Sequence, residues 1–572
     1  MSADHGAATI TVRQTVDLLD GPFATVADGI SEGHYAFWLG SGISFGRLAG
    51  LNQIVPKVVE FVRARIDPNE PTCPYAAGME EVFDLAGLSD AEKTEVNREL
   101  PFSDWPNASA ITSRLVTNYA RLLDIQIDGQ PEDHILWDGI DVSSTFADPA
   151  VEPDVEHLCI AILVLEGVVT VIASANWDGL IERAIESLTD SVPTLVACVR
   201  SEDLQLPDLS ARLLKFHGCA VKASQNEADF RPYLVGRQSQ INRWIVNPSN
   251  AGMVDRLTTI IATKPTLMIG LSAQDANIQS IFAHASVRLG WAWPGDRPSY
   301  VFSQNAIGPD QRGLLQNVYR DAYTAENRMA IEDSALIRAY AKPLLIALVL
   351  HVLCQKLQTL IDLAPEALDA HGKTDLKAGV IALRNALADS VGADPLKFTE
   401  SLIEGCGHAQ SMFRQGRRPM KAGLYKSVTR SPVQGMAGDP GLAGAGMHEA
   451  AIAAGILGKG VSDRLWTLKG PNVSDQKAGV AEVLSKTGPT KIFVAANGQA
   501  ALRLRLNGLI EDEDNAILIH SLEIVDTMAR SPRGALGRTG HPTVREVSIT
   551  ELLVEATSAD NLLRRFREEV AL

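Results

Sequence analysis

Three polar side chains that can act on a small substrate follow hydrophobic runs of the chain. Asn176 and Asp178 come after the run at 168–174, and His217 comes directly after LLKF. An asparagine and an aspartate can hold a ribose hydroxyl, a carboxamide or an attacking water, and histidine is a natural general base near neutral pH. We therefore take Asn176, Asp178 and His217 as the candidate catalytic residues.

Two glycine-containing turns, GSGIS and GLSAQD, offer candidate binding residues for a phosphate-bearing ligand. Glycines at the end of a strand let backbone N–H groups approach a diphosphate, and the N-terminus of the following helix adds a favourable dipole. The candidate ligand-binding residues are Gly40, Ser41, Gly42 and Ser44 in the first turn, and Gly270, Ser272 and Asp275 in the second.

Each of these motifs also has a purely structural interpretation. Asp178 can cap the helical pattern LIERAIESL that follows it. Ser272 and Asp275 fit the S-x-x-D capping arrangement of a helix start. The first turn departs from the G-x-G-x-x-G spacing, because its third glycine is Gly46, so a simple strand-to-helix turn remains open.

The elements that must position these residues alternate between strand and helix patterns. Strands are predicted at 34–39, 168–174, 194–199, 212–217, 266–270 and 299–303. This alternation is typical of an α/β domain with a Rossmann-like parallel sheet, in which groups at the carboxyl ends of the strands face a common ligand. The segment between Gly46 and Gly167 is mostly helical and predicts an insertion that caps the sheet.

The remainder of the chain predicts two further parts. Helices are expected at 334–364 and 373–391, with Pro343 as a break or kink. Strands at 491–497 and 515–525, followed by a helix, predict a small C-terminal α/β unit. The predicted domains are 1–310, an α/β catalytic domain; 311–415, a helical linker or oligomerisation segment; and 416–572, a regulatory or partner-binding domain.

The composition limits the classes of binding partner and the cellular compartment that we expect. The net charge of −17 argues against a broad attraction to nucleic acid or to anionic membranes. No signal peptide is evident and the longest apolar run is too short to span a membrane, so we expect a cytoplasmic protein without a membrane partner. The six cysteines form no C-x-x-C pair, which indicates neither a disulfide framework nor a zinc knuckle.

Local basic residues leave one route to an anionic partner. They are Arg414, Arg417, Arg418, Lys421, Lys426 and Arg430, and then Arg530, Arg533, Arg538 and Arg545. These can bind nucleic acid or a phosphorylated effector, although a solvated linker is the interpretation that the acidic total favours.

Taken together and in order, the strand-end segments resemble the sirtuin fold, and more closely the SIR2-like domains of bacterial antiphage defence proteins. Gly40 to Ser44 is similar to the family's G-A-G-x-S motif, and Ala175 to Asp178 to its Q-N-x-D motif. His217 and Gly218 match its H-G motif, and GLSAQDANI resembles the G-[YF]-S-x-x-D-x-x-I pattern of the defence branch. The resemblance covers about the first 310 residues.

Two departures separate the chain from protein-deacylating sirtuins. No P-D-F-R stretch follows Ser44, and between His217 and Gly270 only Cys219 is available, where those enzymes carry a four-cysteine zinc module. A structural zinc site usually needs four such ligands. We therefore expect no zinc, no other metal site and no acyl-lysine-binding apparatus.

The resemblance implies an NAD+ hydrolase with NAD+ as its substrate. Asn176 would orient the nicotinamide ribose or a water, Asp178 would contact the carboxamide, and His217 would act as general base, giving ADP-ribose and nicotinamide. The implied role is an effector of antiphage defence that acts by NAD+ depletion, as in abortive infection. The alternatives are an NAD-dependent protein deacylase and a non-catalytic sensor of NAD+ or ADP-ribose.

Activity of this kind requires control, which we assign to the C-terminal half. We expect a homo-oligomer, with a HerA-like ATPase as a possible partner on a separate chain, since no Walker A motif is present. Nucleic acid would be contacted only through a partner or through the local basic segment.

Overall fold

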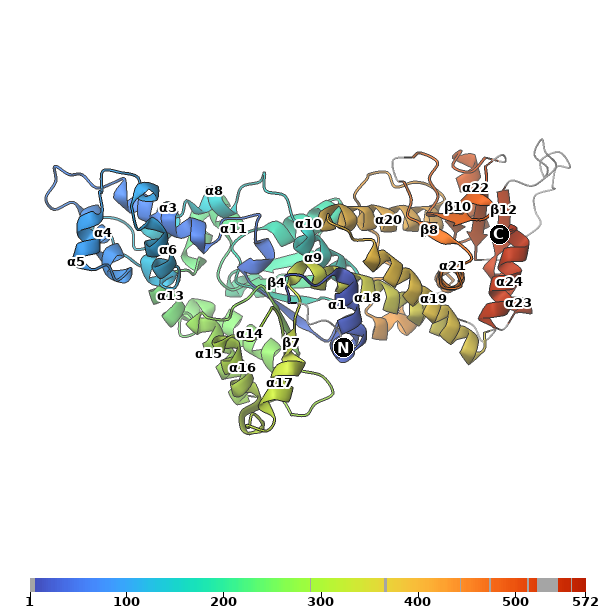
Figure 1. Cartoon of the computed structure of the whole chain (residues 1–572), viewed down its shortest axis with the longest axis horizontal. Helices are drawn as coiled ribbons and strands as arrows, with labels where there is room; N and C mark the ends of the chain where they lie inside the picture. Colours follow the sequence, from blue (N-terminus) through green and yellow to red (C-terminus); the bar gives the residue numbers. More distant parts are fainter. Residues whose placement is uncertain are drawn as a thin grey trace.

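A computed structural model of the chain describes residues 6–288, 290–364, 368–442, 444–472, 475–511, 514–521, 544–556 and 558–572. The molecule is elongated, with a central parallel sheet between a helical insertion at one end and a second, smaller sheet at the other (Figure 1). The helices α14 to α17 project below the central sheet in this view.

The central sheet has seven strands in the order β3-β4-β2-β1-β5-β6-β7, and all neighbouring pairs are parallel. The strands are β1 Ala36–Leu39, β2 Val171–Ser174, β3 Leu195–Cys198, β4 Ala211–Lys215, β5 Thr266–Ile269, β6 Tyr300–Ser303 and β7 Leu336–Ile337. All six predicted strands are present, and the predicted Rossmann-like α/β fold is confirmed. Strands β2 to β4 lie on one side of β1 and β5 to β7 on the other, so the strand order reverses beside β1, at the switch point where such sheets bind ligands.

Helices cover both faces of this sheet, so its strands are apolar on both sides. Phe37 and Leu39 face a cluster built with helices α1, α9, α10 and α18, while Trp38 faces a cluster built with α14, α15 and α16. The bounds are α1 Val12–Asp20, α9 Val155–Leu165, α10 Leu180–Thr189 and α18 Ala341–Asp362 on the first face, and α14 Ala251–Thr263, α15 Ala276–Arg288 and α16 Pro309–Tyr319 on the second.

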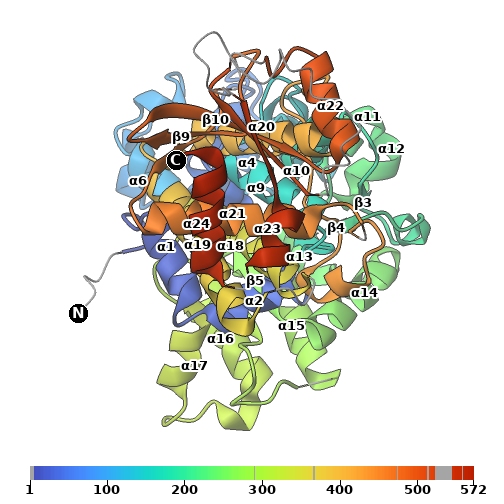
Figure 2. The same ribbon diagram turned by 90° about the vertical axis from the view of Figure 1, so that its right-hand side faces the viewer.

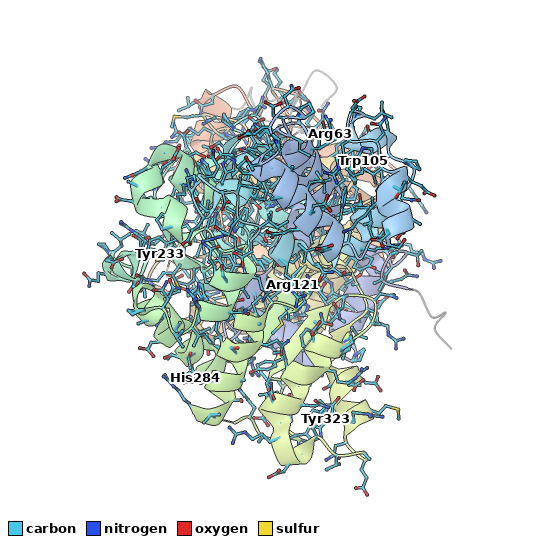
Figure 3. The ribbon with its side chains drawn as sticks, turned by 90° about the vertical axis from the view of Figure 1, so that its left-hand side faces the viewer. Arg63, Trp105, Arg121, Tyr233, His284 and Tyr323 are labelled. Carbon is cyan, nitrogen blue, oxygen red and sulfur yellow. The ribbon has the colours of Figure 1, made fainter. Side chains whose placement is uncertain are left out.

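The segment between β1 and α9 is helical, as predicted, and has its own apolar core. Its main helices are α3 Leu51–Arg63, α4 Pro74–Leu85, α6 Ala108–Val116, α7 Tyr119–Leu122 and α8 Val142–Phe146. Figure 3 views this end of the molecule, with Arg63 and Trp105 on the insertion and His284 on α15 below. The insertion reaches the strand ends through Phe146, whose ring packs edge-on against Trp177, 5.4 Å between ring centroids.

The C-terminal part combines long helices with a five-stranded sheet in the order β12-β11-β10-β9-β8 (Figure 2). Its strands are β8 Thr467–Lys469, β9 Ala481–Ser485, β10 Gly488–Ala495, β11 Ala516–His520 and β12 Val544–Ser548. Strands β10, β11 and β12 pair in parallel, and β9 pairs antiparallel with both β10 and β8. The packed helices are α20 Pro395–Gln415 and α22 Gly498–Leu506 on one face, with α21 Met447–Ser462, α23 Ile549–Glu555 and α24 Ala559–Val570 on the other; α19 Ala370–Asp389 packs on α21.

The helix predicted at 334–364 was placed too early. Leu336 and Ile337 form edge strand β7 beside β6, and the helix begins only at Ala341. Pro343 therefore lies in the first turn of α18, where a missing N–H costs no hydrogen bond, and the predicted break at Pro343 is wrong. The central sheet thus continues past residue 310; the division of the chain at 310 and 415 stays a prediction. The predicted strand at 515–525 ends at His520, and its residues from 522 onward lie outside the described residues.

Helix α18 is the one helix among the described residues that is long and apolar enough to cross a membrane. Within it, 72% of the most apolar stretch is buried inside the protein, against α1, α9 and the central sheet. This is the environment of a core helix, which agrees with a soluble protein. The cytoplasmic compartment stays a prediction.

Candidate functional site

The strand register brings the candidate residues to one edge of the central sheet. Leu39 pairs with Ser174 and with Ile269, and Ser174 pairs with Lys215. Asn176 and His217 therefore follow adjacent parallel strands by the same number of residues. Neighbouring strands lie about 4.8 Å apart, so these two side chains share the carboxyl edge with the glycine turn after β1.

Ser44 is the centre of a buried hydrogen-bonded cluster at this edge. Its Oγ lies 3.1 Å from His157 Nε2, 3.0 Å from Asp178 Oδ2 and 3.4 Å from Asn176 Nδ2. All four side chains are buried, and His157 is fully so. The structure thus joins the predicted residues Ser44, Asn176 and Asp178, and adds a histidine that the sequence analysis did not select.

The direction of these hydrogen bonds follows from the helix start at α9. The backbone N–H of Asp154, the N-cap residue, donates to Nδ1 of His157 at 3.1 Å. Nδ1 is therefore an acceptor, Nε2 carries the proton and donates to Ser44, and the Ser44 hydroxyl donates to Asp178. Burial lowers the pKa of His157, against the opposing effect of Asp178 and Asp154, which keeps the imidazole neutral as this scheme requires.

Asn176 retains an acceptor without a partner. Its side chain is 7% exposed, its Nδ2 points to Ser44, and its Oδ1 is buried with no hydrogen-bond partner in the described chain. A buried polar atom without a partner costs about 1–3 kcal/mol. Such an atom is expected where a ligand hydroxyl or a water completes the site.

Lys215, the last residue of β4, holds the turn that carries Asn176 and Asp178. The Lys215 ammonium group is 1% exposed, donates to the backbone carbonyl of Asp178, and pairs with Glu182 Oε1 at 3.0 Å. Burial would lower the pKa of Lys215, but Glu182 and the other nearby anionic groups raise it above its usual value, so the ammonium stays charged. Asp178 Oδ1 also accepts the Leu180 N–H at 3.1 Å, so this residue caps the helix start as well as contacting Ser44.

His217 forms a separate pair with Asn277, the second residue of α15. Its Nε2 lies 2.8 Å from Asn277 Nδ2, and Asn277 Oδ1 accepts the backbone N–H of Ile278 at 3.0 Å. The amide therefore donates to Nε2, which leaves the proton of the neutral ring on Nδ1. Burial lowers the pKa of His217, with opposing contributions from Asp275 and Asn277. A neutral buried imidazole has the protonation state that a general base needs.

The glycine turns pack against each other. The Gly40 N–H donates to Ile269 O and the Gly42 N–H to Gly270 O, both at 3.1 Å. A Cβ at Gly40 would lie 2.4 Å from Gly270 O, and Gly270 itself has a φ of +63°. These glycines therefore allow the turns after β1 and β5 to touch, and the two amides are already engaged. Contact of Gly40, Ser41, Gly42 and Gly270 with a diphosphate stays a prediction.

The capping interpretation of Ser272 and Asp275 is wrong. Helix α15 begins at Ala276, so Asp275 precedes it instead of lying in its first turn, and its backbone carbonyl accepts the Ile278 N–H at 3.0 Å. The Asp275 carboxylate accepts the Tyr119 hydroxyl at 2.6 Å, which ties the helical insertion to the loop after β5. Ser272 is exposed on that loop.

The side chains that sequence reasoning missed have weak local signals. His157 lies in the apolar run VEHLCIAILVL, where a histidine is usually a core residue, and Lys215 lies inside a strand. Tyr119 carries no motif, and Asn277 is included only in the GLSAQDANI match, which extends beyond Asp275.

The basic residues of the C-terminal half make mostly local contacts. Arg414 donates to Gln410 and to the carbonyl of Val428, Lys426 donates to Ser411, and Lys421 pairs with Asp190. Arg545 donates to the carbonyl of Val570 at 2.7 Å. Arg530, Arg533 and Arg538 lie outside the described residues. Binding of an anionic partner here stays a prediction.

In the described part of the chain, no group of three or more histidine, cysteine, aspartate or glutamate side chains is arranged to hold a metal ion. The expectation of a site without zinc stays a prediction.

A doubly wound parallel sheet, with polar side chains gathered at its carboxyl edge beside the switch point, places this molecule among the α/β proteins that bind ligands at that edge. Residues 170–322 match the family model of the SIR2-like domain, and the chain therefore contains a SIR2-like domain. No curated protein matches the chain. SIR2-like domains bind NAD+, which supports an NAD-related function. The matched range includes Asn176, Asp178 and His217, whereas Ser44 and His157 lie outside it.

Proposed function

We propose that the protein hydrolyses NAD+ at its nicotinamide glycosidic bond. The observation that carries the proposal is the partnerless Oδ1 of Asn176, buried at the carboxyl edge beside Ser44 and Asp178. This acceptor suits a hydroxyl of the nicotinamide ribose or the attacking water. Its position within the SIR2-like domain supports NAD+ as the molecule that supplies the hydroxyl.

In the proposed reaction the bond between C1′ of the ribose and the nicotinamide nitrogen breaks. Nicotinamide leaves as a neutral molecule with the bonding electron pair, and an oxocarbenium-like centre develops at C1′. Water attacks this centre and gives its proton to His217 Nε2, which accepts from the water once its hydrogen bond from Asn277 is released. The products are ADP-ribose, nicotinamide and one proton. Asp178 holds the carboxamide, and Asn176 holds the ribose hydroxyl or the water.

Product analysis tests the reaction. Purified protein is incubated with NAD+, and nicotinamide, ADP-ribose and, with an acetyl-lysine peptide present, O-acetyl-ADP-ribose are measured. We expect nicotinamide and ADP-ribose in equal amounts, and loss of both in His217→Ala protein that keeps the wild-type unfolding midpoint. Appearance of O-acetyl-ADP-ribose would identify a protein deacylase instead, and calorimetric binding of NAD+ without turnover would favour a sensor.

The biological role that this reaction suits is antiphage defence by NAD+ depletion in the cytoplasm. We place control of the activity in the C-terminal half, through a homo-oligomer and a HerA-like ATPase partner. Mass measurement of the purified protein, alone and mixed with such an ATPase, tests the assembly. A monomer that releases nicotinamide at full rate without any partner would contradict this control.

A further inference from the structure

We propose that His157 is a positioning residue of the NAD+ site, which acts through the Ser44 hydroxyl on Asn176 and Asp178. This inference rests on the proposed function. His157 lies at the third position of α9, is fully buried, and lies outside the range that matches the SIR2-like domain. The contacts of its two ring nitrogens give the reason.

Helix capping accounts for only one of the two ring nitrogens. Nδ1 accepts the Asp154 N–H at 3.1 Å and completes the capping box at the start of α9. A residue that served the helix alone would need nothing at Nε2. Nε2 instead lies 3.1 Å from Ser44 Oγ, in the turn after β1, which is a separate element of the fold.

The two donors to Ser44 Oγ determine what its own proton does. His157 Nε2 and Asn176 Nδ2 both point to this oxygen, at 3.1 and 3.4 Å. The hydroxyl proton therefore goes to Asp178 Oδ2, at 3.0 Å, while Asp178 Oδ1 accepts the Leu180 N–H. Because its Nδ2 is held by Ser44 Oγ, Asn176 keeps Oδ1 for the substrate, while each oxygen of the Asp178 carboxylate can still accept a second hydrogen bond from the carboxamide.

The cap residue that fixes the His157 tautomer is itself held on two sides. Asp154 Oδ2 lies 3.2 Å from Arg47 Nε and 2.9 Å from Lys342 Nζ. Arg47 belongs to the loop after the glycine turn, and Lys342 to the first turn of α18. The chain of hydrogen bonds from Asp154 to Asp178 thus connects α18, α9 and both strand ends, and gives the Ser44 hydroxyl one orientation.

Two substitutions separate positioning from folding. In His157→Gln, the amide Nε2 can still donate to Ser44, and Oε1 can accept the Asp154 N–H, as glutamine does at the third position of a capped helix. In His157→Phe, both functions are lost. His408→Phe is the matched control, because His408 is a buried histidine of α20 whose Nε2 lies 3.2 Å from the carbonyls of Ala478 and Gly479, in the C-terminal sheet region. Nicotinamide release gives kcat and KM for NAD+, and calorimetry gives the affinity for NAD+.

We expect kcat of His157→Phe to fall about 10- to 100-fold and KM for NAD+ to rise by a smaller factor, because misplacement of groups at the reacting bond costs rate more than ground-state binding. His157→Gln should keep kcat within about fivefold of the wild type, and His408→Phe should keep both constants. Wild-type kcat in His157→Phe would overturn the inference, and so would equal losses in His157→Phe and His157→Gln.

Failure of the proposed function gives a different result. If the wild type binds NAD+ but releases no nicotinamide, the hydrolase assignment is wrong. The NAD+ affinities of the variants then test whether His157 positions the site. Positioning predicts weaker NAD+ binding in His157→Phe, with wild-type affinity in His157→Gln and His408→Phe. Equal affinity in all three variants would overturn the positioning role.

Discussion

In both sheets of this molecule, polar residues follow the parallel strands, but the hydrogen-bond partners of these residues differ between the two sheets. In the C-terminal sheet, Asn497 follows β10 and its Oδ1 accepts the Ala500 N–H at 2.9 Å as the N-cap of α22. Ser521 follows β11 and its Oγ donates to the carbonyl of Ala496. In the central sheet, Asn176 follows β2 in the same way, but its Oδ1 has no partner in the described chain.

This difference separates a helix cap from a candidate site. An asparagine after a strand is suited to either use, because its side chain can accept an N–H of the next helix or a hydroxyl of a ligand. Asn497 Oδ1 accepts an N–H of its own helix, α22. Asn176 Oδ1 does not, because α10 begins only at Leu180 with Gly179 as its N-cap, and the Leu180 N–H is accepted by Asp178 Oδ1.

The largest effect should come from Asn176→Ala. We expect nicotinamide release to fall about 100- to 1,000-fold, since a preorganised group at the reacting bond is lost, with little change in the unfolding midpoint. The measurement is kcat/KM for NAD+ beside a thermal unfolding curve. If Asn176→Ala retained more than about a tenth of the wild-type rate, Asn176 would be a structural residue like Asn497 and not a residue of the site.

Lys356→Met tests the junction between the two sheet regions. Lys356 of α18 is fully buried and bonds to Glu166 Oε2 and to the Thr429 carbonyl, both at 2.7 Å. Removal of the ammonium leaves the buried Glu166 carboxylate without its counter-charge, although Tyr425 and Val428 still donate to it. We expect a loss of about 3–5 kcal/mol in unfolding free energy from denaturant curves. The control is Lys459→Met, because the two partners of Lys459, Asp463 and Asp560, are both exposed and the loss of these pairs should cost about 1 kcal/mol or less.

Glu156→Gln tests the charge balance beside His157. The side chain is 5% exposed, its Oε2 has no partner among the described residues, and burial raises the pKa of Glu156 to about 7. The folded protein therefore binds this proton more tightly than the unfolded chain, whose glutamate has a pKa of 4.5. The resulting stability is fully present below pH 4.5 and is lost as the pH rises through 7.

The expected size of this effect is about 3 kcal/mol. Relative to the wild type, Glu156→Gln should gain stability between pH 5 and pH 8, measured by urea unfolding at both pH values. A difference between the two proteins that stays constant with pH would show that Glu156 titrates as an ordinary surface group.

Asn497→Ala should have the smallest effect. We expect a loss of about 1 kcal/mol in unfolding free energy, the usual cost of an N-cap, and unchanged kcat/KM for nicotinamide release. The same two measurements as for Asn176→Ala apply. A large loss of activity without loss of stability would move the functional site, or its control, to the C-terminal sheet.

The sequence determined the central fold and the identity of three of the four residues in the buried cluster, Ser44, Asn176 and Asp178. Hydrophobic runs that stop at Gly40, Asn176, His217 and Gly270 are sufficient to predict parallel strands and a common carboxyl edge, because strand period and strand ends are local properties. The edge strand β7 was not predictable in this way, since two residues carry no periodicity and pair only because β6 is present beside them.

Only the tertiary structure determined which polar groups of the site still lack a hydrogen-bond partner within the described chain. His157 is 113 residues from Ser44 in the chain, and Asn277 is 60 residues from His217, so neither hydrogen bond has a local signal. Whether a carbonyl oxygen such as Asn176 Oδ1 finds a partner depends on every element packed around it. The sequence gives the type of the residue that follows a strand. Whether the polar atoms of that residue find hydrogen-bond partners depends on the elements that fold around it.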